Sequence, residues 1–458
     1  MNRVFLAGAL TFSLAGIGCA AGTATVAPPD TPRKIEEGSK PGDPRKTAAE
    51  TRAEALFQHA LSEMASLDRA GSWTEKDCAD VATGFLEAAE IEGGKVAVKA
   101  IFNAGVAGER CQKDEEARKH FERALALSPG FHPANVRLIL LRHRAAGGKD
   151  LDRTIAELRK AAIVDAKYTN VEGLVALAML SLQRGNEAAD ADGPNDRARA
   201  VRYLQSALAV DDGYSPAMNG LALYYLGEAR AGAGRKAARA SLSSAHSGEA
   251  RPTQAMELAA LVCSQALRKD PSDPVIHNTY GLIQVELGNL GKAAEAFGKA
   301  RQLRPGFYEA EMNFAAVNLQ FRGFTKAEEA YRAVLAKRPD DYDARIGLAL
   351  ALRGQIQESD AGALMEAAGK ELKKARQIAP DRPEAYYNEA ILTQEYRARD
   401  AGDGTRAQLS LAVELFERFI HKAGSSSEYA ETVKTARQRI SEIQEIVRFL
   451  GDSEKSGS

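Results

Sequence analysis

Small and apolar residues recur along the chain in pairs of short helical patterns, and prolines mark the period. Pro271, Pro305 and Pro339 follow one another at intervals of 34 residues. Between the first two, Gly281 stands where paired helices cross closely, and Phe297 is suited to fill the layer between them. Since a proline cannot continue the preceding helix and favours the turn into the next, each proline closes a unit. The pattern predicts helix pairs that repeat every 34 residues.

The same plan extends in both directions from this clear pair of units. We expect eight units, each with a small-residue and a large-residue position in its second helix, and a ninth, vestigial unit at residues 47–94. The eight begin near Val98, His132, Thr169, Ser215, Pro274, Tyr308, Tyr342 and Pro383. With 6% aromatic residues and abundant alanine, the composition favours closely approaching helices, so one continuous body accounts for most of the 458 residues.

Over residues 47–424 the chain resembles the tetratricopeptide repeat family, most specifically in the units that start at Val98, Pro274 and Tyr308. The resemblance implies an all-α solenoid in which helix-turn-helix repeats form a right-handed superhelix. The usual tryptophan of the family is replaced in four units, by Ile101, His277, Glu311 and Tyr386.

Residues 425–450 form an amphipathic pattern at the end of the predicted solenoid. Val433, Ile440 and Val447 recur at helical spacing, and charged residues occupy the other side. We interpret this segment as a capping helix, followed by a polar tail at 451–458. A helix that docks a partner is the alternative.

The first residues read as a secretory signal. Asn2 and Arg3 precede an uncharged apolar run that ends in small residues before Cys19, too short to cross a bilayer as a mature helix. The segment 15–19 resembles a bacterial lipobox, although Gly16 replaces the usual leucine. The resemblance implies cleavage after residue 18, lipid attachment at Cys19 and sorting to the outer membrane; an ordinary signal peptide is the alternative. Residues 19–46 are rich in Pro, Gly, Thr, Lys and Glu, which predicts a disordered tether.

Two of the four cysteines are candidates for a disulfide. Cys78 and Cys111 fall near the turns of adjacent units, which project from the same edge of a solenoid, and an oxidising periplasm would permit the bond. Two buried free thiols are the alternative. Cys263 occupies a core position.

The sequence contains no recognisable catalytic or metal-binding motif. Seven scattered histidines form no metal-ligand spacing, and no catalytic order of serine, histidine and aspartate can be recognised. We therefore expect no enzyme activity, no metal and no cofactor. The 61 basic and 62 acidic residues balance, so nucleic-acid binding is not expected.

Protein binding remains. Asn103, Asn313 and Asn388 occupy the sixth position of the first helix, where asparagines of the family can pair with a peptide backbone. Met312 and Tyr387 lie beside them and predict a groove with apolar as well as polar character. Asparagines that are merely hydrated are the alternative.

Extra residues recur between the helices of several units and are expected along one edge of the solenoid. They are residues 186–196, 232–251, 354–362 and 398–405. Such insertions modify a partner surface or are simply tolerated loop growth.

Taken together, these features predict a periplasmic scaffold that is anchored in the outer membrane and binds other envelope proteins. The whole-chain layout resembles the adventurous gliding-motility lipoproteins of myxobacteria, which implies a place in a trans-envelope motility complex. Two alternatives stay open: a pilotin-like assembly factor for a secretin or pilus channel, and a regulatory partner of a cell-wall enzyme.

Overall fold

The computed structural model describes residues 47–71, 73–91, 96–163, 170–240, 254–357 and 361–456. The predicted signal peptide, Cys19 and the predicted tether lie outside these residues. Two compact units divide the chain. The N-terminal unit comprises the described residues up to Gly288 together with 302–305, and the C-terminal unit comprises 289–301 and 306–456.

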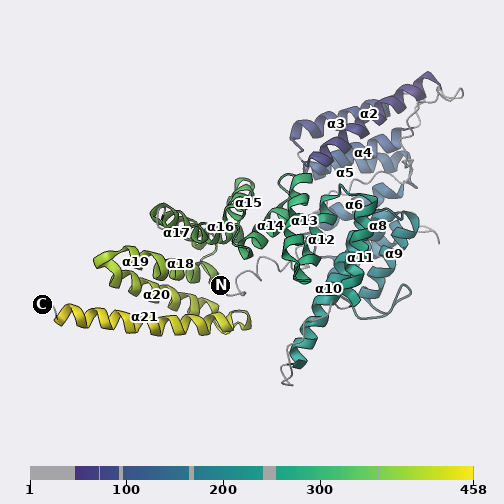
Figure 1. Ribbon diagram of the computed structural model, residues 1–458. Helices are drawn as coiled ribbons and strands as arrows, with labels where there is room; N and C mark the ends of the chain where they lie inside the picture. The colour runs from purple at the N-terminus through teal and green to yellow at the C-terminus, as the bar shows by residue number, and fades with distance from the viewer. Residues whose placement is uncertain are drawn as a thin grey trace. The chain divides into compact units, whose positions relative to one another are not determined.

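The N-terminal unit is a succession of antiparallel helix pairs (Figure 1). Its helices are α2 (Ala48–Ala70), α3 (Glu75–Glu90), α4 (Ala97–Arg110), α5 (Asp114–Leu127), α6 (His132–Ala145), α7 (Leu151–Ala162), α8 (Val171–Arg184), α9 (Asp196–Val210), α10 (Ser215–Ala240), α11 (Gln254–Lys269) and α12 (Pro274–Glu286).

The C-terminal unit continues the same kind of helix pairing. Its elements are α13 (Leu290–Leu303), α14 (Tyr308–Gln320), α15 (Phe324–Lys337), α16 (Tyr342–Gly354), α17 (Ala361–Ile378), α18 (Glu384–Leu392), the π-helix η2 (Thr393–Arg397), α19 (Ala398–Asp400), the 3-10 helices η3 (Gly402–Gly404) and η4 (Ser427–Tyr429), α20 (Thr405–Ala423) and α21 (Ala430–Ser456). The predicted all-α solenoid is confirmed in both units, and each predicted unit start lies within two residues of an observed helix start.

Local chemistry explains where several of these helices begin. Thr47 and Thr74 each cap a helix, and each forms a reciprocal pair of hydrogen bonds with an acidic residue three positions on, Glu50 or Asp77. The side chain of Asp273 accepts hydrogen bonds from the first turn of α12, in which Pro274 occupies a position where no amide hydrogen is needed.

Close helix crossings form the core, as the small residues predict. In the N-terminal unit a β-carbon at Gly105 would lie 2.6 Å from the Phe121 ring, so only glycine allows α4 and α5 this approach. In the C-terminal unit the Tyr331 ring lies against Gly347 in the same way, where a β-carbon would lie 2.1 Å from it. Both aromatic side chains are buried. At each crossing, one aromatic ring packs against one glycine.

The end of the C-terminal unit departs from the regular repeat. Residues 384–400 form one continuous helical run because the π-helix η2 joins α18 to α19. The predicted insertion at 398–405 is therefore mostly helical instead of a loop. The last helix, α21, lies along α20 (Figure 1). It continues to Ser456, so most of the segment predicted as a polar tail is also helical.

Within the described residues, none of the helices combines the length and apolar character that crossing a bilayer requires.

Candidate functional site

The five residues predicted for a peptide groove are all buried. Asn103 lies on α4, Met312 and Asn313 on α14, and Tyr387 and Asn388 on α18, and no more than 7% of any of them is exposed. These three helices are thus covered at the positions where the groove was expected. This arrangement does not favour direct hydrogen bonds between these amides and an extended peptide. The groove stays a prediction.

The asparagines differ in their surroundings. Neither amide atom of Asn103 has a hydrogen-bond partner among the described residues. The Asn388 amide nitrogen donates to the Glu384 carbonyl oxygen at 2.9 Å, within its own helix. The Asn388 side-chain oxygen lies 3.4 Å from Nη1 of Arg353, so this amide connects α18 to α16.

Cys78 and Cys111 are joined by a disulfide, and their Cα atoms are 6.3 Å apart. Cys78 lies in α3, and Cys111 directly follows α4. The bond therefore links the first two helix pairs. Cys263 is a buried free thiol in α11, and burial raises its pKa to about 12, so it stays protonated at neutral pH.

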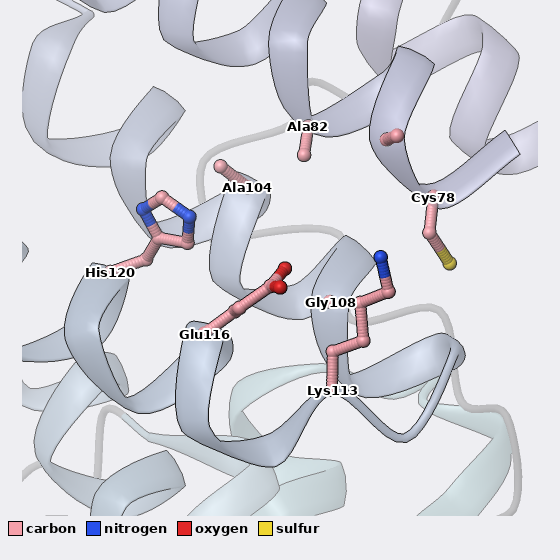
Figure 2. A pocket seen from close by; sticks show the side chains of 8 residues that line it. Cys78, Ala82, Ala104, Gly108, Lys113, Glu116 and His120 are labelled. Atoms are coloured by element: carbon pink, nitrogen blue, oxygen red, sulfur yellow. The ribbon is translucent and has the colours of Figure 1, made fainter. Parts of the chain in front are cut away.

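A small pocket lies beside this disulfide (Figure 2). Cys78 and Ala82 of α3 and Ala104 of α4 form one side, and Glu116 and His120 of α5 line another. Burial lowers the pKa of His120, with the charge of a neighbouring arginine acting in the same direction. The pocket holds about 50 Å³, room for water molecules but not for a peptide segment.

A second polar site lies in the C-terminal unit, where the regular repeat ends. We call it the C-terminal polar cluster and define it as Arg353, Tyr387, Asn388, Glu395 and Arg439. These residues come from four elements, α16, α18, η2 and α21. Three of them carry charge, two arginines and one glutamate, so the cluster has a net charge of +1.

One of its arginines is held firmly in place. Arg439 of α21 donates from Nη1 to the Gln394 side-chain oxygen at 2.8 Å and forms an ion pair with Glu395 at 3.0 Å. Since both partners belong to η2, the π-helix fastens the last helix to the preceding repeat.

The other arginine has no such partner. Arg353 is partly exposed, and among the described residues no carboxylate lies within 4.0 Å of its guanidinium. Its contacts are the Asn388 backbone and side-chain oxygens, 3.5 and 3.4 Å from Nη1, both longer than an ordinary hydrogen bond. Burial lowers the pKa of Arg353, and the charge of Arg439 acts in the same direction, while Glu395 opposes it.

Other partly buried arginines of the C-terminal unit are paired with carboxylates. The pairs are Arg301 with Glu311, Arg345 with Glu371, Arg376 with Glu389, Arg382 with Glu384 and Arg397 with Glu389. Arg353 therefore stands apart from the structural ion pairs around it.

The sequence pattern predicted Tyr387 and Asn388 as site residues but missed Arg353, Glu395 and Arg439. The extra residues predicted at 398–405 were a signal, for which a modified partner surface and tolerated loop growth were the two interpretations. A second signal is Gly369 of α17, where an added β-carbon would lie 2.0 Å from the Arg397 guanidinium. The glycine leaves room for the Arg397 guanidinium in its observed position.

No group of three or more His, Cys, Asp and Glu side chains in the described part of the chain is arranged to hold a metal ion.

The tetratricopeptide repeat family model matches residues 314–383. Among solved structures, a tetratricopeptide repeat protein from Parabacteroides merdae is 14% identical over 67% of this chain and 98% of its own, with a TM-score of 0.38. PilF from Pseudomonas aeruginosa is 16% identical over 58% of this chain and 98% of its own, with a TM-score of 0.40.

YrrB, described as a tetratricopeptide protein with an unusual peptide-binding site, is 18% identical over 53% of this chain and 98% of its own, with a TM-score of 0.33. No curated protein sequence matches the chain. The family match covers α15, α16 and α17 in full, and it includes the crossing of Tyr331 with Gly347 described above. Residues 314–383 are therefore tetratricopeptide repeats.

Proposed function

We propose that this protein is a non-enzymatic scaffold that binds partner proteins through its helical repeats while a lipid on Cys19 anchors it in the outer membrane. The observation that supports the binding role most directly is the tetratricopeptide match at residues 314–383, since arrays of this kind expose long surfaces on which other chains dock. The anchor rests on the lipobox-like segment 15–19 and the apolar run before it.

The partners that we propose are envelope proteins, and the assembly is a trans-envelope complex for gliding motility. A lipidated end and a repeat array on one chain suit a component that holds other proteins near the membrane. The layout of signal, tether, repeats and terminal helix supports this assignment.

The test is crosslinking in intact cells, followed by affinity isolation and mass spectrometry of the recovered proteins. The native protein is compared with the Cys19→Ala variant. The matched control is Cys263→Ala, which removes the buried thiol of α11 and leaves Cys19 in place. Incorporation of a labelled fatty acid into each protein is measured in parallel.

We expect the native and control proteins to carry lipid and to recover components of both membranes, and the Cys19→Ala protein to lose both properties. An unchanged partner set for the Cys19→Ala protein would contradict the anchor. Recovery of a channel precursor alone would replace the motility assignment with that of an assembly factor.

A further inference from the structure

The C-terminal polar cluster contains an arginine, Arg353, with which no carboxylate of the described residues forms an ion pair. Arg353 lies near the end of α16, and among the described residues its hydrogen-bond acceptors are two oxygens of Asn388 at 3.4 and 3.5 Å. A guanidinium has five donors and normally pairs with a carboxylate when it is withdrawn from water. Among the described residues Arg353 therefore makes no ion pair that would stabilise the fold.

The residues around Arg353 do not remove this cost. Glu395 is the acidic member of the cluster, and its carboxylate forms an ion pair with Arg439 at 3.0 Å. The net charge of +1 in the cluster is thus matched by one incoming negative charge. Glu395 and Arg439 are also only partly buried, so the charged side chains of the cluster stay accessible from solvent.

We propose that the C-terminal polar cluster binds an acidic side chain of a partner protein, with the guanidinium of Arg353 pairing with its carboxylate and Tyr387 and Asn388 forming the floor of the site. This assignment rests on the proposed scaffold function and names the chemistry of the partner: a protein segment rich in Asp or Glu. Arg439 fixes η2 and α21 at the rim and positions the site.

The test uses the full chain and two synthetic peptides. The first is a ten-residue peptide of alternating Glu and Ala with both ends blocked, so that its only charges are side-chain carboxylates. The second is a Gly-Ser peptide of equal length with a free carboxyl end. Binding is measured by fluorescence anisotropy at low and high salt.

The informative variant is Arg353→Met, which keeps the length of the side chain and removes its charge. The matched control is Arg437→Gln, which removes a positive charge from an exposed position of the same helix as Arg439. We expect the blocked acidic peptide to bind the native protein and the control equally. It should bind Arg353→Met about 10- to 100-fold more weakly, as for loss of a charge-assisted hydrogen bond.

Thermal unfolding distinguishes a binding residue from a structural one. Because no carboxylate of the described residues pairs with Arg353, Arg353→Met should keep or raise the unfolding temperature. A fall of more than about 5 °C would assign Arg353 to folding and overturn the proposal. Arg353→Lys, which keeps the charge but not the planar fork, should retain part of the binding.

Other outcomes also decide the question. Equal binding of the acidic peptide to Arg353→Met and the control would overturn the proposal, as would binding of the Gly-Ser peptide alone, which would assign the site to a chain end. If the Arg353→Met protein still recovers the same partners in cells, the scaffold function stands and this site is wrong.

Discussion

The disulfide between Cys78 and Cys111 should stabilise the first two helix pairs of the N-terminal unit against unfolding. It connects α3 to the end of α4 across 33 positions of sequence. By the chain-entropy relation, a closed loop of this length removes entropy from the unfolded chain that is worth about 4 kcal/mol at 25 °C. Since each repeat is stabilised mainly by its neighbours, this stabilisation should be concentrated in the first two helix pairs.

The perturbation is the double replacement Cys78→Ala and Cys111→Ala, because a single replacement would leave a thiol free to react. Alanine at position 78 avoids placing a hydroxyl at a buried site. Hydrogen exchange with mass spectrometry reads the outcome helix by helix. A loss of about 4 kcal/mol corresponds to exchange between about 100- and 1,000-fold faster for the amides of α3 and α4.

Two comparisons show whether the reasoning holds. Amides of α16 and α17 serve as an internal control, and reduction of the native protein should reproduce the pattern of the double variant. If the amides of α3 and α4 exchange within about twofold of the native rate, the loop-entropy reasoning is refuted. An equal acceleration in α16 and α17 would instead show that the chain unfolds as one unit and that the effect is not local.

Two further predictions concern packing and pH. Gly347→Ala places a β-carbon 2.1 Å from the buried Tyr331 ring and should destabilise the C-terminal unit by about 1–3 kcal/mol in denaturant titration, whereas Gly362→Ala, with nothing within 4 Å, should not. Burial acts to raise the pKa of Asp196, but hydrogen bonds, the largest from Arg184, outweigh it and lower the pKa to about 2. The ionised Asp196 carboxylate therefore stabilises the fold at pH values above its unfolded pKa of 3.8, and this stabilisation is lost as the pH falls toward 2. In Asp196→Asn the unfolding temperature should depend less on pH over that interval than it does in the native protein.

The sequence predicted the regular part of this fold well because the repeat constrains it at several levels. A small and an aromatic residue such as Gly281 and Phe297 can be recognised in the pattern, and both are buried in the structure. Helix starts such as Pro274 follow from the same logic, since proline is tolerated where the amide hydrogen is not required. Position in the repeat therefore predicts both secondary structure and core.

The candidate site was harder to predict, because its residues meet through departures from the repeat. Asn388 was singled out by its position, yet its amide nitrogen donates within the protein, to the Glu384 carbonyl oxygen. The junction of η2 with α21 depends on an ion pair between Glu395 and Arg439, residues that are far apart in the sequence. The repeat period carries no information about such a contact, because the two residues meet only when α21 packs against η2.

The arginines of the C-terminal unit indicate how structural and functional charges can be separated in a repeat array. Arg345 forms an ion pair with Glu371 between α16 and the helix that follows it, a contact that stabilises the stacking of neighbouring helices. Arg353 lies on the same helix as Arg345 but has only two long contacts with oxygen atoms. An arginine that pairs with a carboxylate between neighbouring helices, as Arg345 does, has a structural role. Arg353 is partly exposed and pairs with no carboxylate of the described residues, so a carboxylate of a partner can form the ion pair that the described fold does not supply, which makes this position the first place to look for a partner.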